Sequence, residues 1–475
     1  MKINMSTYLT SQKENLKKIV TKLSEDFKYV SILAVDTKGK KFGVSKSGYN
    51  LGDSMWTERG FVIRVHNGVN YSEYSFNAID EDLDQFIDNL RKSFKGSFES
   101  LVEAKMETNA YDLIEEDEKM ETFFAEVEIH PQEMNSKDKM DRLSKIMKAA
   151  LASSDDLVDF RVNYEEVRVA KMFLSTHKDL EQAYAWSQGF MVAISRRDDQ
   201  TKFFYDSSAG LKGLEILDEL EGLYPKIVEG AVKLLDAQPI EPGEYDIICA
   251  PDVSGLIAHE AFGHGVEMDM FVKNRAKAVE YLNKPVGSAK VSMHDGAAAS
   301  YNVSSYLFDD EGILGSDTKV IDQGILKTGI SDVLSAMKLG TQPTGNGKRE
   351  SFERKAYARM TSTFFTGGQD KLEDMIASIE KGYLLEGVMS GMEDPKNWGI
   401  QCMLVQGKEI IDGKLTGKIV SPVIMTGYVP DVLNSVDMVS EHVKIDGSGT
   451  CGKGHKEWVK TADGGPYIKA KGRLG

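Results

Sequence analysis

A short proline-containing segment divides this chain of 475 residues into two unlike halves. The segment from Asp236 to Gly243 carries two prolines and a glycine. Proline fixes φ and lacks a backbone donor, so a regular element must end here and a linker is expected. We therefore predict one domain over residues 1–236 and a second over residues 243–475, and the length is sufficient for two or three domains.

The N-terminal half has helical and strand-like patterns in alternation. Alternating apolar and polar residues, as in 61–65, predict strands with one covered face, hence an α+β sheet carrying helices on one side. Helices are expected over 12–27, 137–152 and 213–235 and from residue 80, and strands over 29–35, 60–65, 71–76, 158–162, 167–175, 189–194 and 202–205. Residues 1–110 and 120–236 resemble two copies of one helix-strand-strand-helix unit; duplication and chance similarity explain this equally well.

The C-terminal half is rich in glycine and in short strand-like runs. Strands are expected at 245–249, 290–293, 319–321, 403–405 and 418–423, and helices near 254–268, 272–283 and 370–382. Turn signals such as Asp322-Gln323-Gly324 separate or flank the strands. We predict a mainly antiparallel β domain, barrel-like or sandwich-like, wrapped around the first of these helices. The fold class of the whole chain is then α+β.

Composition excludes several classes of protein. No apolar run approaches the roughly 20 residues of a membrane helix, and the first residues lack the apolar core of a secretory signal. The net charge of −16 disfavours nonspecific binding to nucleic acid. With three cysteines no disulfide framework is expected, and a reducing cytoplasm is the expected location.

The helix expected near 254–268 carries two histidines with a glutamate between them, His259-Glu260-Ala261-Phe262-Gly263-His264. Imidazoles bind zinc-like ions, and an adjacent carboxylate can take a proton from metal-bound water. Positions i and i+5 lie roughly 140° apart on a regular α-helix, so the two rings would diverge. A π-type turn would bring them to one side, and Gly263 and Gly265 lower the cost of an irregular backbone.

Two histidines need a third protein ligand, with one position left open for water. The downstream candidates are Cys451, His294, His442 and His455. Cys451 lies in a loop dense in glycine, where Lys453 could favour its thiolate. Cys249 and Cys402 lie in apolar strands and are expected to be small buried hydrophobic residues.

Four segments together resemble the TldD/PmbA family of metallopeptidases: HEAFGHGVEMD (259–269), FDDEG (308–312), TGNGKRES (344–351) and GTCGKG (449–454). The resemblance implies that His259, His264 and Cys451 bind one divalent ion per chain, of the zinc type, and that Glu260 is the base. It further implies a metal-bearing, TldD-like subunit in a homodimer, or in a heterodimer with a related subunit.

The function expected from this resemblance is hydrolysis of peptide bonds in short or unfolded peptides. Two alternatives stay open: a non-hydrolytic metal-binding or scaffold subunit of a two-chain peptidase, and a metal-dependent amidase acting on small modified molecules. The acidic triplet 309–311 could form a second metal site, orient the metal ligands or be a solvated turn. Lys348 or Arg349 could hold a peptide carboxylate, and Lys453 and His455 could contact the transition state.

Overall fold

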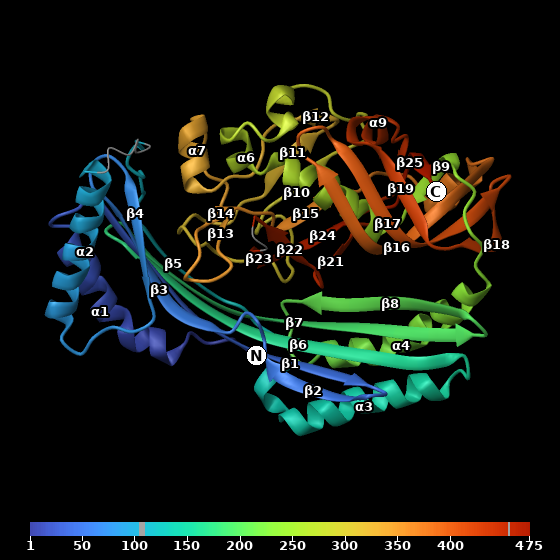
Figure 1. Ribbon diagram of the computed structural model, residues 1–475, viewed down its shortest axis with the longest axis horizontal. Helices are drawn as coiled ribbons and strands as arrows, with labels where there is room; N and C mark the ends of the chain where they lie inside the picture. Colours follow the sequence, from blue (N-terminus) through green and yellow to red (C-terminus); the bar gives the residue numbers. More distant parts are fainter. Residues whose placement is uncertain (104–109, 455–456) are drawn as a thin grey trace.

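The computed structural model describes residues 1–103, 110–454 and 457–475. Figure 1 shows a large curved sheet, built by the N-terminal half, lying beneath the C-terminal half. The protein is α+β, as predicted. None of the helices in these ranges combines the length and the apolar character needed to cross a membrane.

The N-terminal half forms one eight-stranded sheet, in the order β4-β3-β1-β6-β7-β5, with β2 beside β1 and β8 beside β7. Its elements are α1 (Thr7–Leu23), β1 (Tyr29–Ser45), β2 (Gly48–Asp53), β3 (Glu58–His66), β4 (Tyr71–Phe76), α2 (Leu83–Glu103), β5 (Lys119–Phe124), η1 (Pro131–Glu133), α3 (Ser136–Ala152), β6 (Leu157–Ser175), β7 (Lys178–Arg197), β8 (Gln200–Gly210), α4 (Ile216–Lys233) and η2 (Leu234–Asp236).

Strand β6 is continuous where the sequence predicted two strands with a break between them. The polar residues in its middle are paired rather than solvated. Glu165 accepts hydrogen bonds from Ser54 and Gln188, and Glu166 pairs with Lys139. Because the buried Glu165 and the half-buried Glu166 both have partners, the strand continues through a stretch that looks like a turn in the sequence.

The sheet carries its helices on one face, as predicted (Figure 1). Alternate residues of β1 show this: Ile32 packs under α1 and α2, and Phe42 packs under α3 and α4. Leu33 and Val35 point to the opposite face and contact Phe308 of the C-terminal half. The C-terminal half thus covers the face that the helices leave free. Whether the two parts of the N-terminal half arose by duplication stays a prediction.

Five strands of the C-terminal half close into a barrel, in the order β16-β9-β25-β19-β17, with β17 pairing back to β16. Only the β16–β9 pair of this ring is parallel, so the mainly antiparallel barrel is confirmed. The barrel strands are β9 (Gly243–Cys249), β16 (Lys381–Asp394), β17 (Gly399–Ile411), β19 (Val423–Tyr428) and β25 (Ile468–Leu474), and β18 (Lys414–Val420) and β20 (Met438–Val439) extend them.

A second, six-stranded sheet and several short elements complete this half. The sheet contains β12 (Ile325–Leu326), β11 (Thr318–Asp322), β10 (Met293–Asp295), β15 (Ser362–Phe365), β24 (Ala462–Gly465) and β21 (Lys444–Asp446), and the two hairpins are β13 (Gly347–Lys348) with β14 (Tyr357–Ala358) and β22 (Thr450–Lys453) with β23 (Glu457–Lys460). The helical elements are α5 (Pro251–Leu256), η3 (Ile257–Gly263), η4 (His264–Val266), α6 (Met268–Val272), η5 (Lys277–Tyr281), α7 (Val333–Leu339), α8 (Leu372–Ala377) and α9 (Val429–Asn434).

Two predicted helices are largely wrong. Residues 272–283 contain the end of α6 and the short turn η5, because Asn274 adopts φ 52° and interrupts the helix. The helix expected over 370–382 ends at Ala377, and β16 begins at Lys381, where it pairs with β9 and β17. The strand expected over 418–423 is divided between β18 and β19 at Ser421 and Pro422.

Candidate metal centre

His259 lies on the π-helical turn η3, which follows α5, and His264 caps this turn as the first residue of the 3-10 turn η4. The backbone N–H of His264 donates to the carbonyl of His259, which is the i to i+5 hydrogen bond of a π turn. The extra residue in the motif is therefore absorbed by the wider turn. The two imidazole ring centroids lie 5.3 Å apart, so the expected convergence is confirmed.

The glycines beside His264 serve a different purpose from the one predicted. Gly263 has an ordinary right-handed conformation, with φ −57°, so the backbone there does not require glycine. A Cβ at Gly263 would instead lie 2.1 Å from Sδ of Met360. A Cβ at Gly265 would lie 2.8 Å from Oε1 of Glu393. Both glycines make room for neighbouring side chains that pack against the turn.

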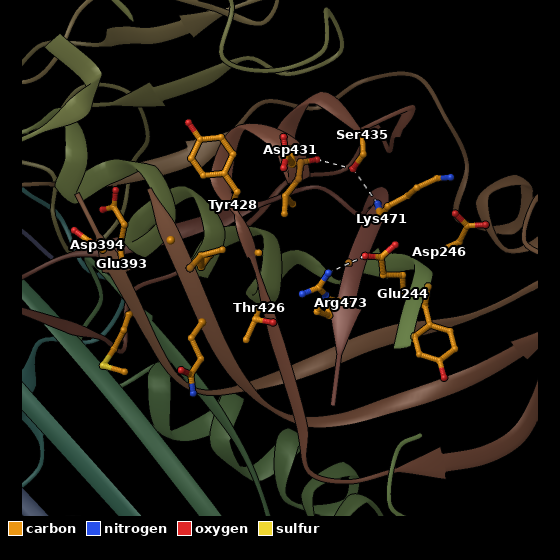
Figure 2. Close-up of a pocket in the computed structure, with 18 of the residues that line it drawn as sticks. Glu244, Asp246, Glu393, Asp394, Thr426, Tyr428, Asp431, Ser435, Lys471 and Arg473 are labelled. Carbon is orange, nitrogen blue, oxygen red and sulfur yellow. Dashed lines mark hydrogen bonds and ion pairs between the residues drawn. The ribbon is translucent and has the colours of Figure 1, made fainter. Parts of the chain in front are cut away.

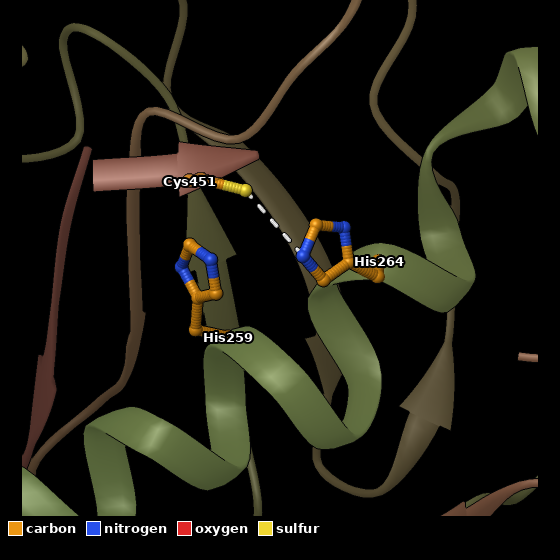
Figure 3. Close-up of side chains that lie close together, drawn as sticks. All are labelled: His259, His264 and Cys451. Atoms are coloured by element: carbon orange, nitrogen blue, oxygen red, sulfur yellow. Dashed lines mark hydrogen bonds between the residues drawn. The ribbon is translucent and has the colours of Figure 1, made fainter. Parts of the chain in front are cut away.

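Cys451 reaches the histidines from the hairpin β22–β23, where it is paired with Val459. Its Sγ lies 3.4 Å from Nε2 of His264, a residue 187 positions earlier. One ligand atom from each of His259, His264 and Cys451 lies within 4.8 Å of the others. Figure 3 shows both rings facing the sulfur. Cys451 and His259 are buried, and His264 is half-buried.

The charges of these three groups favour the form of the thiol that binds metals. Burial opposes ionisation of Cys451, but the imidazoles of His259 and His264 outweigh burial and lower the pKa of the thiol to about 4. Burial likewise acts against imidazolium, and the Cys451 thiolate raises the pKa of His259 above its usual value. The thiolate, not the thiol, is the metal ligand.

This donor set fits a zinc-type ion. Imidazole nitrogen and thiolate sulfur are both zinc ligands, and three protein ligands leave a fourth position open, as in catalytic zinc sites. Buried imidazole nitrogen is costly without a partner, and Nδ1 of His259 has no hydrogen-bond partner among residues 1–103, 110–454 and 457–475. His259, His264 and Cys451 form the one group of potential ligands found in those ranges.

Glu260 lies beside the donor set without joining it. Its Oε2 is 3.9 Å from Nε2 of His264, and its side chain is 27% exposed, against 19% for His264. A carboxylate that stays near the ligands and in contact with solvent is suited to proton transfer.

The other candidate ligands lie elsewhere. His294 is on β10, with Nδ1 2.6 Å from Oδ1 of Asp317, and His442 is exposed. His455 lies outside the described residues. Cys249 and Cys402 are buried in the core of the C-terminal half, as expected of small hydrophobic residues.

The acidic triplet 309–311 is buried, so its interpretation as a solvated turn is wrong. Asp309 accepts backbone hydrogen bonds from Glu311, Ile313 and Gly347. Asp310 pairs with Lys171 of β6, and Glu311 accepts a 2.6 Å hydrogen bond from Arg64 of β3. The triplet joins the C-terminal half to the N-terminal sheet, away from the group of three ligands.

The two basic residues after residue 347 are already engaged. Arg349 makes two hydrogen bonds to the carboxylate of Glu73 on β4, of 2.5 and 3.0 Å. Lys348 Nζ donates to the carbonyls of Met360 and Lys460. Their proposed contact with a peptide carboxylate stays a prediction, and for Arg349 it would require exchange of the Glu73 pair.

Four charged residues beside the centre were not singled out as part of it by the sequence: Glu267, Asp269, Arg359 and Glu393. Glu267 accepts a hydrogen bond from Nδ1 of His264 at 3.2 Å, and its spacing three residues after that histidine was the available signal. Burial raises the pKa of Glu393 well above its usual value. No sequence pattern connects Arg359 or Glu393 to the centre, because both reach it through tertiary packing.

Two of the cavities beside the barrel adjoin residues that act on the metal centre. One of 490 Å³ separates β8 and α4 from the C-terminal half and is lined at one end by Asp463, whose charge acts on His259. The other, of 1210 Å³, is shown in Figure 2; it lies among β9, β19, β25 and α9, and its lining includes none of the three ligands. The lining of the 490 Å³ cavity also includes none of the three ligands; Asp463 connects this cavity to His259, and Glu393, which lines the 1210 Å³ cavity, connects that one to His264.

Comparisons with known proteins find metallopeptidase relatives. Residues 242–472 match the PmbA/TldA metallopeptidase C-terminal domain. A metalloprotease from Methanothermobacter thermautotrophicus is 29% identical over 326 residues, which is 68% of this chain and 71% of the relative. A zinc metalloprotease TldD homolog from Saccharolobus solfataricus is 25% identical, over 71% of this chain and 75% of the relative.

A solved structure shows the same fold. TldE from Thermococcus kodakarensis has a TM-score of 0.76 and 18% identity, over 97% of this chain and 99% of that one. The matched domain and the relatives place the protein in the class of metallopeptidases. More particularly, the chain belongs to the TldD/PmbA family.

Proposed function

We propose that the protein is the metal-bearing, TldD-like kind of subunit and hydrolyses peptide bonds in short or unfolded peptides. The observation that carries this proposal is the convergence of His259, His264 and Cys451 within 4.8 Å, from elements far apart in the chain. These residues would hold one divalent ion, of the zinc type, per chain.

Such an ion, when bound, supplies Lewis-acid chemistry, since it lowers the pKa of water and stabilises negative charge on a carbonyl oxygen. Glu260 supplies the proton transfers. Its partly exposed carboxylate would accept a proton at Oε2 from the attacking water and then donate that proton to the leaving amine. Glu260 ends each cycle ionised, as it began.

The 490 Å³ cavity is the proposed route for the peptide. It is bordered by Phe204–Ser207 of β8, a strand that pairs with β7 alone among the described strands. A free strand edge can bind an extended peptide through main-chain hydrogen bonds, with little demand on its sequence. This mode of binding favours unfolded substrates, because most backbone groups of a folded protein are already paired.

We also infer that the subunit works as a dimer, with a second copy or with a related subunit. The likeness to a TldE structure supports a related subunit as the partner. Mass measurement of the purified chain, alone and mixed with a related subunit, distinguishes these arrangements.

Glu260→Gln tests the proposed chemistry. We expect hydrolysis of an unstructured peptide to fall by about 10²- to 10⁴-fold, because the base is lost, while the metal content stays equal to that of the wild type. Glu280→Gln, at an exposed glutamate, is the matched control and should retain full activity. A chelator should abolish the wild-type activity.

Three results would contradict the proposal in different ways. Unchanged peptide hydrolysis by Glu260→Gln would show that Glu260 is not the base. A wild-type chain that binds the ion yet cleaves no peptide would be a scaffold subunit. Cleavage of simple amides in preference to unstructured peptides would indicate an amidase.

A further inference from the structure

A buried ion cluster lies directly behind the proposed metal ligands. It contains two carboxylates, of Glu267 and Asp269, and two cations, of Arg359 and Lys453. We propose that Glu267 and Arg359 are positioning residues, which hold the His264 ring and the Cys451 hairpin at the separation that an ion needs. This inference rests on the proposed metal site and names what fixes its geometry.

Glu267 sets the orientation of the His264 ring. The Nδ1–H of His264 donates to Oε2 of Glu267 at 3.2 Å, and the Glu267 side chain is 1% exposed. With the proton held on Nδ1, the lone pair of Nε2 is free to bind an ion. That same Nε2 lies 3.4 Å from Sγ of Cys451, so the ring already faces the other ligand.

Arg359 holds the hairpin that carries Cys451. One guanidinium nitrogen donates to the Cys451 carbonyl at 2.8 Å, and another donates to the Glu457 carbonyl of the facing strand at 2.9 Å. Its Nε lies 3.6 Å from Oε1 of Glu267. The rigid guanidinium fork thus joins both strands of the hairpin to the carboxylate that orients His264.

Lys453 forms a second link between the Cys451 hairpin and the segment that follows His264. It follows Cys451 by two residues on β22, and its Nζ lies 3.0 Å from Oε2 of Glu267 and 2.6 Å from Oδ1 of Asp269. Two carboxylates and two cations balance in charge, which is the condition under which such groups can be buried. The π turn and the hairpin are therefore tied by contacts that do not involve the ion.

The same contacts keep Glu267 out of the ligand set. Its Oε2 is shared between His264 and Lys453, and Glu267 is absent from the group of three convergent donors. A fourth protein ligand would close the coordination position that a substrate or water must occupy. Glu267 contributes by orienting a ligand, and the open position is preserved.

The test uses the full-length chain and Glu267→Gln, which keeps the shape of the side chain and removes its charge. Zinc affinity is measured by competition with a chromophoric chelator, and cobalt-loaded protein gives an absorption spectrum that reports thiolate coordination. We expect zinc to bind about 10- to 100-fold more weakly, as for other residues that orient a metal-bound histidine, and the cobalt bands to change in intensity. Arg359→Lys, which cannot form the fork, should weaken binding in the same way.

Glu166→Gln is the matched control, because it removes one carboxylate from a remote buried ion pair with Lys139. It should lower stability to urea and leave zinc affinity and the cobalt spectrum within twofold of wild type. If Glu267→Gln and Arg359→Lys behave like this control, the cluster is merely structural and the inference is overturned. If Glu267→Gln fails to fold, Glu267→Asp and Arg359→Lys decide the question by the same measurements.

Cys451→Ser separates this inference from the proposed function. A wild-type chain that binds no zinc, or a Cys451→Ser chain that binds it as tightly as wild type, overturns the proposed metal site and the inference with it. Zinc bound through Cys451, with unchanged affinity in Glu267→Gln and Arg359→Lys, overturns the inference alone.

Discussion

Gly263 shows how the lack of one side chain shapes the metal centre. The backbone at this position is ordinary, yet the space that a Cβ would occupy is filled by Met360. Met360 is fully buried, so it has little room to withdraw. The π turn is therefore held from outside by packing as well as from inside by its own hydrogen bond between His264 and His259.

We expect Gly263→Ala to lower the free energy of unfolding by about 1–3 kcal/mol, because an added methyl group overpacks the core. Urea denaturation measures the change, and the double variant Gly263→Ala/Met360→Ala should lose less than the sum of the two single changes. Gly96→Ala is the control, since a Cβ there meets nothing within 4 Å and alanine favours a helix. Equal stability of Gly263→Ala and wild type would show that the Met360 side chain can move away at no cost in free energy.

At the residue level, the sequence was sufficient to choose the three proposed ligands, which the structure brings together, and insufficient for what surrounds them. Spacing and glycine content led to His259, His264 and a π turn, and the family resemblance led to Cys451. Arg359 and Glu393 carry no local signal, because their positions depend on how the second sheet and the barrel pack against the turn. Gly263 was recognised for the wrong physical reason, since a packing constraint cannot be seen without Met360.

At the level of elements, the buried turn 309–311 joins two structures that the sequence treats separately. Arg64 of β3 bridges Glu311 of this turn and Glu73 of β4, and Arg349 adds a second cation to Glu73. Acidic turns usually face solvent, and this one is buried because the N-terminal sheet supplies its cations. Contacts between residues distant in the sequence also explain two other differences from prediction. Side-chain partners of Glu165 and Glu166 keep β6 continuous, and backbone pairing with β9 and β17 forms β16 where a helix was predicted.

Glu73 gives this network a testable dependence on pH. Burial alone would raise the pKa of Glu73, but Arg64 and Arg349 lower it to about 2 from the usual 4.5. A lowered pKa stabilises the folded state above pH 4.5, and the effect is lost as pH falls from 4.5 toward 2. We expect wild type to exceed Glu73→Gln in free energy of unfolding by about 3 kcal/mol at pH 7, and by progressively less below pH 4.5.

Urea denaturation of both chains between pH 7 and pH 3 measures this difference, and other titrating groups cancel because the two chains share them. If the difference in free energy of unfolding between the two chains stayed constant across this pH range, Arg64 and Arg349 would not lower the pKa of Glu73.

At the level of the whole molecule, the two halves share one interior. The N-terminal sheet buries Leu33, Val35 and Phe173 against Phe308, and a second shared cluster contains Val167, Trp186 and Val303. The prediction of two domains came from the linker and from the different composition of the two halves, neither of which carries information on contact between them. The linker near residue 240 marks where one half of the sequence ends and the next begins. The packing of the two halves shows that each would expose apolar side chains without the other.

This shared interior predicts that an ion bound in one half stabilises both. A ligand present at a thousandfold excess over its Kd adds about 4 kcal/mol to the free energy of unfolding, which slows globally exchanging amides about a thousandfold. We expect chelation to speed exchange of the slowest amides of β6, in the N-terminal sheet, by the same factor as those of β9 and β25 in the barrel. Hydrogen exchange followed by mass spectrometry resolves these strands. Faster exchange confined to the barrel would instead mean that the two halves unfold independently, and that the buried contacts between them are too weak to make the molecule one cooperative unit.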